Sequence, residues 1–235
     1  MGTEGSGGAS LFCSVHNSQS FHLSMCRLLV VRSQDPFDPC SHLTRFASLC
    51  RSSKEFQGHG WGCAWREEGR GWQIYRNLCP IWEDDPSRFP RTTLLVTHAR
   101  SAFEDKDIAV ENNMPFSDGE RVFIFNGELR GVRIREEGRI GAEKIFNFIR
   151  RFDRGDMLAA LKKAAGLIQN RTRYIRGMNI LMVKERTIYL STFFSEDEDY
   201  FTIRFKEGRE LVICSEAYPS EGGWQSVANG TVREW

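Results

Sequence analysis

The sequence predicts an α+β fold in which β-sheets are sandwiched by helices. Short apolar stretches typical of strands occupy the first half of the chain, two adjacent amphipathic helices follow, and a second series of strands comes after them. Strands and helices that occur in separate runs favour packed sheets covered by helices over alternating βαβ units.

Five strands and one helix are expected before the two central helices. Strands are predicted at residues 26–31, 60–66, 71–76, 92–99 and 121–125. The second and third form a hairpin around the turn Glu67-Glu68-Gly69-Arg70. A helix is predicted over residues 37–54, with Pro36 and Pro39 crowding its start, and a polar loop over residues 80–90.

The two central helices are predicted from apolar residues that recur at helical spacing. Ile145, Phe148, Ile149 and Phe152 form the apolar face of the first helix, and Met157, Leu161, Ala164, Ala165 and Ile168 that of the second. Asp156 can cap the second helix. Further strands are predicted at residues 178–183, 187–193, 200–205 and 210–214.

The charge balance indicates no polyanionic partner. Lys plus Arg total 32 and Asp plus Glu total 31, which gives a formal net charge of +1 without a basic block. Nucleic acid and membrane are therefore not expected as partners. No stretch approaches the roughly 18 apolar residues of a membrane span, so we expect a soluble protein.

The seven cysteines are an odd number and show neither a CxxC motif nor a four-ligand Cys/His set at metal-site spacing. They are typical of reduced thiols in a cytoplasmic protein, not of a disulfide framework or a zinc site. We expect no metal and no cofactor.

Residues 1–25 are expected to be a disordered leader that precedes one domain at residues 26–235. The leader is rich in Gly and Ser, carries Glu4 as its one formal charge, and has only a brief apolar run, unlike a secretory signal. Three origins fit it: a propeptide, an upstream extension of a start at Met25, or a segment of artificial origin. In the second case methionine aminopeptidase would expose Cys26.

Cys26 is the first candidate catalytic residue because it directly follows Met25. A cysteine that becomes N-terminal carries its own base, the freed α-amino group, which can take the thiol proton. The alternative is an ordinary buried cysteine at the start of a core strand, since residues 28–31 are all apolar.

Further motifs follow Met25-Cys26 in a definite order. They are Gly58-His59-Gly60-Trp61-Gly62-Cys63, Thr97-His98-Ala99-Arg100, Asn112-Asn113-Met114-Pro115-Phe116 and Phe125-Asn126-Gly127-Glu128. The series resembles the class II glutamine amidotransferases, whose glutaminase domain is an N-terminal-nucleophile hydrolase. The resemblance is strong from Cys26 to about Ile149 and looser to Trp224. It implies a four-layer α/β/β/α sandwich of two mainly antiparallel sheets covered by helices.

The resemblance also implies roles for four residues. Cys26 attacks the side-chain amide of glutamine and forms a γ-glutamyl thioester, with its α-amino group as base and acid. Arg100 holds the substrate α-carboxylate, and Asn126 with Gly127 forms the oxyanion hole. Taken alone, Arg100 also fits a surface arginine at a strand end, and Asn-Gly also fits a hairpin turn.

Other positions match the family in part. Trp61 and Gly62 match a Gly-Trp-Gly strand that helps to wall the nucleophile pocket, so Trp61 is a predicted substrate-binding residue. His59 stands where relatives often carry aspartate, and Met114 and Phe125 each replace a histidine.

Gly141 is the position where the difference from the family has the largest consequence for substrate binding. Relatives usually carry an aspartate there that binds the ammonium of glutamine, and a buried ammonium without a partner is costly. Either the substrate is a γ-glutamyl compound with a modified amine, or a nearby acid such as Glu128 binds the ammonium.

Together these features predict an amide hydrolase of the glutamine amidotransferase type that acts on glutamine or a γ-glutamyl amide and releases ammonia or an amine. The residues after about Gly141 are too few for a synthase domain. A separate synthase subunit therefore receives the ammonia, or the product is the hydrolysed acid. The alternative is a non-catalytic binding or regulatory domain that retains the fold and keeps Met25.

Overall fold

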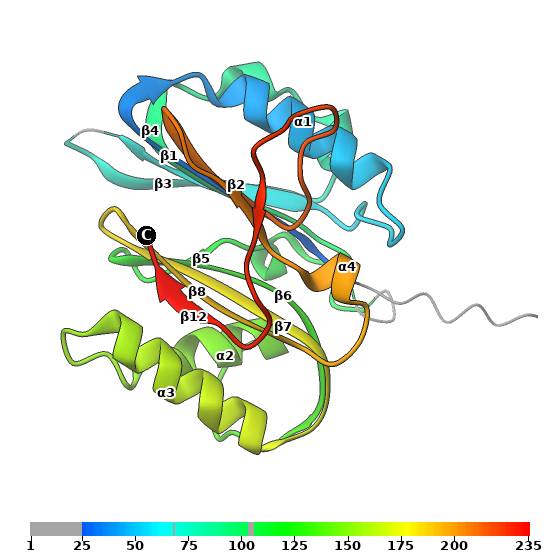
Figure 1. Cartoon of the computed structure of the whole chain (residues 1–235), viewed down its shortest axis with the longest axis vertical. Helices are drawn as coiled ribbons and strands as arrows, with labels where there is room; N and C mark the ends of the chain where they lie inside the picture. The colour runs from blue at the N-terminus through cyan, green and yellow to red at the C-terminus, as the bar shows by residue number, and fades with distance from the viewer. Residues whose placement is uncertain (1–24, 68, 103–105) are drawn as a thin grey trace, which may run out of the picture.

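The computed structural model describes residues 25–67, 69–102 and 106–235, so the predicted leader lies outside the described residues except for Met25. Two β-sheets pack face to face, and helices cover the outer face of each (Figure 1). The four-layer sandwich confirms the predicted fold class. Across the described residues, none of the helices is long and apolar enough to cross a bilayer.

The first sheet has seven strands in the order β11-β9-β10-β1-β4-β2-β3. They are β1 (Arg27–Phe37), β2 (Trp61–Glu67), β3 (Gly71–Asn77), β4 (Thr92–Ala99), β9 (Arg204–Lys206), β10 (Glu210–Cys214) and β11 (Gln225–Ser226). The central strands β1 and β4 are antiparallel with Arg27 opposite Ala99. This register places Cys26, just before β1, beside the residues that follow β4.

The second sheet has five strands in the order β12-β8-β7-β6-β5. They are β5 (Phe116–Ser117), β6 (Arg121–Val132), β7 (Thr172–Lys184), β8 (Thr187–Phe194) and β12 (Val232–Glu234). In the long pairing of β6 with β7, Asn126 lies opposite Asn179 and Gly127 opposite Met178. The predicted oxyanion residues therefore lie inside a strand and not in a hairpin turn.

Helix α1 (Pro39–Arg51) covers the first sheet, and α2 (Gly141–Arg150) with α3 (Met157–Asn170) covers the second (Figure 1). Asp38 caps α1 by accepting a hydrogen bond from the Cys40 backbone, and Asp156 caps α3 through Ala159, as predicted. Short helical turns complete the chain: η1 (Ile81–Glu83), η2 (Pro86–Arg88), η4 (Val110–Asn112) and α4 (Glu198–Phe201).

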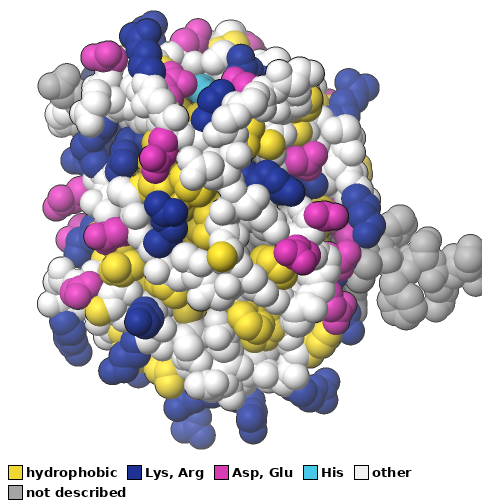
Figure 2. Space-filling view, viewed as in Figure 1, with side chains coloured by type: hydrophobic (Ala, Val, Ile, Leu, Met, Phe, Trp, Pro, Cys, Tyr) yellow, Lys and Arg dark blue, Asp and Glu magenta, His cyan; other side chains and the backbone are white. Residues whose placement is uncertain are grey.

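Alternating side chains of β1 supply both layers of the core. Leu28 and Val30 belong to the cluster shared with the second sheet, whereas Leu29 and Val31 pack with the apolar face of α1. Period-two alternation of this kind is what a strand between two apolar layers requires. On the face shown in Figure 2, basic and acidic side chains are interspersed over much of the surface, in keeping with the near-neutral net charge.

The prediction of a strand at residues 200–205 is wrong for the first half of that segment. Residues 200–205 were expected to be extended, but the segment begins with the helical turn α4 and becomes a strand only at Arg204. Asp197 adopts a left-handed backbone at φ 50°, and the turn buries both Tyr200 and Phe201. Neighbouring residues of a strand point to opposite faces, so the turn lets two adjacent aromatic rings enter the same region.

Candidate active site

A cavity of about 550 Å³ opens where the start of β1, the end of β4, the middle of β6 and the start of α2 meet. Its lining includes Cys26, Arg100, Ser101, Gly127, Glu128 and Gly141. The structure therefore brings four of the predicted site residues, Cys26, Arg100, Gly127 and Glu128, to one cavity.

The Cys26 thiol lies against the backbone of Ser101. The Ser101 amide donates to Sγ at 3.5 Å, and Sγ lies 3.6 Å from the Ser101 carbonyl oxygen. Burial raises the pKa of Cys26 to about 11, with the Ser101 backbone and the Arg100 charge acting in the opposite direction. At neutral pH this group is a thiol, and it needs a base before it can act as a nucleophile.

Within the described residues, the thiol contacts the backbone amide and carbonyl of Ser101, and no side-chain base is hydrogen-bonded to it. The nitrogen of Cys26 is bonded to Met25 in this chain and is therefore an amide without a basic lone pair. Removal of Met25 would turn that nitrogen into the amine that the predicted chemistry needs.

Arg100 is only 6 % exposed and lines the cavity beside Cys26. Its guanidinium donates to Asn113 Oδ1 at 3.2 Å and to the Asp107 carbonyl at 2.8 Å. Burial lowers its pKa, while Cys26 and Asp107 oppose that shift. These contacts hold a planar cation at the cavity wall, where it could bind a carboxylate with two parallel hydrogen bonds.

Asn126 is fully buried, and within the described part of the chain neither of its amide atoms has a hydrogen-bond partner. Phe123 of the same strand packs on Phe146 of α2, with 5.2 Å between the ring centres. Side chains alternate between the two faces of a strand, so Asn126, three residues later, faces the first sheet. A buried amide without a protein partner is unusual, and its donor and acceptor groups are available to another molecule.

Gly127 lines the cavity and lies very close to the neighbouring strand. A Cβ atom there would lie 2.3 Å from the Gly177 carbonyl oxygen and 2.7 Å from the Phe125 ring. Only glycine fits this approach without a backbone shift. The tight strand pairing thus explains the glycine at position 127 but not the asparagine before it.

His98 is a buried residue of this region and has no predicted catalytic or binding role. It lies in β4 opposite Leu28, with no exposed surface. Burial and the nearby Arg100 charge lower the pKa of His98 to about 3, opposed by the backbone of Phe125. His98 is therefore neutral at physiological pH and adds no charge between the sheets.

Glu128 reaches the cavity, but arginines already engage its carboxylate. Arg130 lies 2.5 Å from one oxygen, and Arg176 lies 3.7 Å from the other. Binding a substrate ammonium would require Glu128 to share these partners. Gly141, the first residue of α2, has open space around the position of a Cβ atom.

Trp61 does not reach the cavity. Its ring is fully buried in the cluster beneath α1, and its Nε1 donates to Asp84 Oδ2 at 3.0 Å. The alternation of β2 explains the difference, because a side chain on the α1 face of the first sheet is separated from the cavity by the sheet itself.

The sandwich has the layers implied by the resemblance of the sequence, and the beginning of a central strand lies at the cavity. A family model described as "Glutamine amidotransferases class-II" matches residues 25–158, which is more than half of the chain. The chain belongs to the class II glutamine amidotransferase family. None of the curated proteins compared matches it.

Solved structures share the fold at low sequence identity. A glutamine aminotransferase class-II domain protein from Silicibacter pomeroyi has a TM-score of 0.61 at 17 % identity, covering 89 % of this chain and 94 % of that one. A predicted glutamine amidotransferase from Pseudomonas aeruginosa gives 0.56 at 17 %, covering 89 % and 97 %. The glutamine phosphoribosylpyrophosphate amidotransferase from B. subtilis gives 0.58 at 13 %, covering 81 % of this chain and 42 % of that one.

Proposed function

We propose that the protein is an amide hydrolase of the glutamine amidotransferase type, in which Cys26 attacks the side-chain amide of glutamine or a γ-glutamyl compound. The observation that carries the proposal is the meeting of the Cys26 thiol, the buried Arg100 guanidinium and the close-packed Gly127 at one cavity, with the buried amide of Asn126 directly before Gly127 in the same strand. Structural needs alone do not call for that combination.

The proposed reaction begins when the freed α-amino group takes the proton of Sγ and the sulfur bonds to the amide carbon. The negative charge that develops on the amide oxygen would be stabilised by the Asn126 side chain and the Gly127 backbone. The ammonium form of the α-amino group then protonates the leaving nitrogen, the C–N bond breaks, and a γ-glutamyl thioester remains. Water hydrolyses the thioester to the acid and restores the thiol.

The substrate end of the cavity leaves room for more than free glutamine. In this proposal Arg100 takes the substrate α-carboxylate, whereas Glu128 is engaged by Arg130 and Arg176 and Gly141 offers no charge. We therefore include γ-glutamyl compounds with a modified amine among the substrates. The released ammonia goes to a separate synthase subunit, or the hydrolysed acid is itself the product.

A panel of amides tests this proposal. Protein that begins at Cys26 is incubated with glutamine, asparagine, N-acylated glutamine and several γ-glutamyl amides, and acid release is measured by mass spectrometry. We expect release from at least one γ-glutamyl amide and none from asparagine, whose carbonyl is one methylene short. Absence of release from the whole panel would contradict the proposal.

A second function, a non-catalytic binding domain, is favoured by one observation. Met25 has no exposed surface and packs against Phe194, Tyr200 and Phe201, as a residue that stays in place would. N-terminal sequencing of protein from its native host separates the two functions. A start at Cys26 supports catalysis, and a retained Met25 supports the binding domain.

A further inference from the structure

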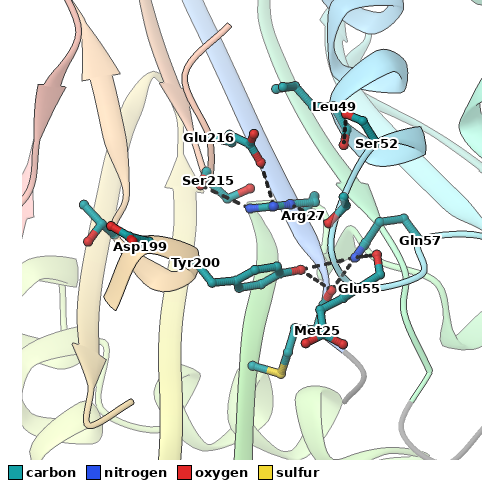
Figure 3. Close-up of polar contacts among 12 residues, drawn as sticks. Met25, Arg27, Leu49, Ser52, Glu55, Gln57, Asp199, Tyr200, Ser215 and Glu216 are labelled. Carbon is teal, nitrogen blue, oxygen red and sulfur yellow. Dashed lines mark hydrogen bonds and ion pairs between the residues drawn. The ribbon is translucent and has the colours of Figure 1, made fainter. Parts of the chain in front are cut away.

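Two side chains from distant parts of the chain hold the peptide group that joins Met25 to Cys26 (Figure 3). Gln57 Nε2 donates to the Met25 carbonyl oxygen at 2.5 Å, and Tyr200 Oη donates to it at 2.6 Å. Gln57 lies between α1 and β2, and Tyr200 lies in α4. Gln57 Nε2 also donates to Tyr200 Oη at 3.2 Å, which fixes the two groups relative to each other.

The same two groups lie near the nitrogen of Cys26. Peptide geometry puts a carbonyl oxygen about 2.3 Å from the nitrogen of the next residue. Gln57 and Tyr200 are therefore within about 5 Å of the Cys26 nitrogen, close enough to reach it with a small side-chain movement. We propose that Gln57 and Tyr200 are positioning residues that hold the freed α-amino group of Cys26. The inference rests on the proposed function, in which that amine is the base.

The hydrogen-bonding capacities fit this role. A neutral amine has two N–H donors and one lone pair, and it can act as a base toward Sγ only if the lone pair faces the sulfur. Two acceptors must then take the N–H groups. Gln57 Oε1 is buried without a partner among the described residues, and the Tyr200 hydroxyl oxygen accepts as well as donates. Rotation of the Gln57 amide would exchange Nε2 for Oε1 at the same place, with loss of the hydrogen bond that Nε2 donates to the Glu55 carbonyl oxygen at 3.0 Å.

The charges around this position also favour a neutral amine. Arg27 places its guanidinium carbon 4.1 Å from the centre of the Tyr200 ring and pairs with Glu216 at 2.6 Å. The Glu55 carboxylate lies 3.4 Å from Arg176, and Arg100 lies on the thiol side. The other titratable groups nearby are Cys50, Lys54, His59, Asp197 and Cys214. Glu55 and Glu216 are each paired to an arginine. The acceptors offered to the amine are therefore the neutral Gln57 and Tyr200, and these stabilise its protonated form less than a free carboxylate would.

The test uses protein that begins at Cys26, verified by intact mass, and follows the pH dependence of Cys26 alkylation by iodoacetamide. Gln57→Leu and Tyr200→Phe each remove one acceptor, and we expect alkylation about tenfold slower at neutral pH. Gln57→Glu keeps the shape but adds a negative charge beside the amine. Because that charge stabilises the ammonium, the acid limb of the profile should move to higher pH. A purely structural role would not give such a shift.

Matched controls are available on the surface. Tyr174→Phe removes a hydroxyl that contacts Glu196, and Gln73→Leu removes an amide that donates to the Arg70 carbonyl. Both should leave the profile unchanged. If Gln57→Leu does not fold, Tyr200→Phe and Gln57→Glu still decide, since neither creates a large cavity.

The inference is overturned if Tyr200→Phe and Gln57→Glu, with Cys26 confirmed as the first residue, give the same rates and the same pH profile as the starting protein. A glutamine-mimicking diazoketone is added in a parallel experiment. If the diazoketone leaves Cys26 unmodified while iodoacetamide shows the expected shifts, the proposed function fails but the positioning of the amine stands.

Discussion

The two ends of the cavity are built differently. At the end proposed to hold the nucleophile, Cys26 directly precedes β1, Arg100 directly follows β4 and Gly127 lies in β6. Both sheets therefore contribute, and the neighbouring Asn126 is fully buried. At the substrate end the wall is formed by the start of α2, where Gly141 and Lys144 are exposed.

The two ends differ in how rigid their residues need to be and in how freely those residues can be substituted. A nucleophile and an oxyanion site need to be fixed to within a fraction of an ångström, which packed strands provide. The exposed amino end of a helix tolerates substitution, so charge can be added or removed there without disturbing the core. We therefore expect large effects on rate at the nucleophile end and smaller effects on substrate choice at α2.

Removal of the nucleophile should have the largest effect. Cys26→Ala eliminates the thioester, so we expect acid release from γ-glutamyl amides to fall by about 10³-fold or more. Cys40→Ala, in α1 and outside the cavity lining, is the control and should be fully active. Activity that survives in Cys26→Ala would remove the basis of the proposed chemistry.

Asn126→Ala should separate catalysis from stability. Loss of one oxyanion donor lowers kcat by about 10²–10³-fold, but the side chain has no hydrogen-bond partner within the described residues, so the free energy of unfolding should change little. Asn179→Ala on the neighbouring strand is the contrast. That residue bonds to Thr192 and to the Phe201 carbonyl, and its loss should destabilise the fold by about 1–3 kcal/mol. Equal rates for Asn126→Ala and the starting protein would refute its role.

Arg100→Lys should weaken substrate binding. The lysine keeps the charge but loses the fork that matches a carboxylate, and we expect kcat/KM to fall about 10–100-fold, mainly through KM. A substrate analogue that lacks the α-carboxylate provides the control, because its rate should be insensitive to the substitution. If both substrates lose the same factor, Arg100 supports the fold instead of binding the carboxylate.

Gly141→Asp should give the smallest effect, and it tests whether charge at the start of α2 determines the choice of substrate. The position has room for a side chain, and an aspartate in the first turn of α2 is favourable for the helix. We expect KM for free glutamine to fall about tenfold, because the new carboxylate can pair with the substrate ammonium. Gly141→Asn is the uncharged control. Identical KM values in the two variants would show that the ammonium binds elsewhere.

Much of the fold could be predicted because local pattern and burial agree. Strand β4 (Thr92–Ala99) is almost wholly buried and was predicted with the same bounds, as was β10 (Glu210–Cys214). Strand β6 extends well beyond the predicted residues 121–125 because its polar second half is held by pairing with β7, which no local pattern shows.

The site could be predicted only where its residues lie in short motifs. Cys26, Arg100 and Gly127 are such residues, and the structure brings them together. Gln57 and Tyr200 meet across 143 residues of sequence, and no local signal marks either of them. Trp61 was predicted at the cavity from a motif, but the strand faces it toward α1, since a motif does not specify which side of a sheet a side chain takes.

The central claim is that Cys26 acts only with a free α-amino group. It is tested most directly by comparing protein that retains Met25 with protein that begins at Cys26, using intact mass after exposure to a glutamine-mimicking diazoketone across pH. With Met25 in place, burial raises the Cys26 pKa to about 11, so modification should be slow at neutral pH and increase with pH up to that value. The protein that begins at Cys26 should be modified rapidly at neutral pH. Equal rates for the two forms at neutral pH would contradict the account.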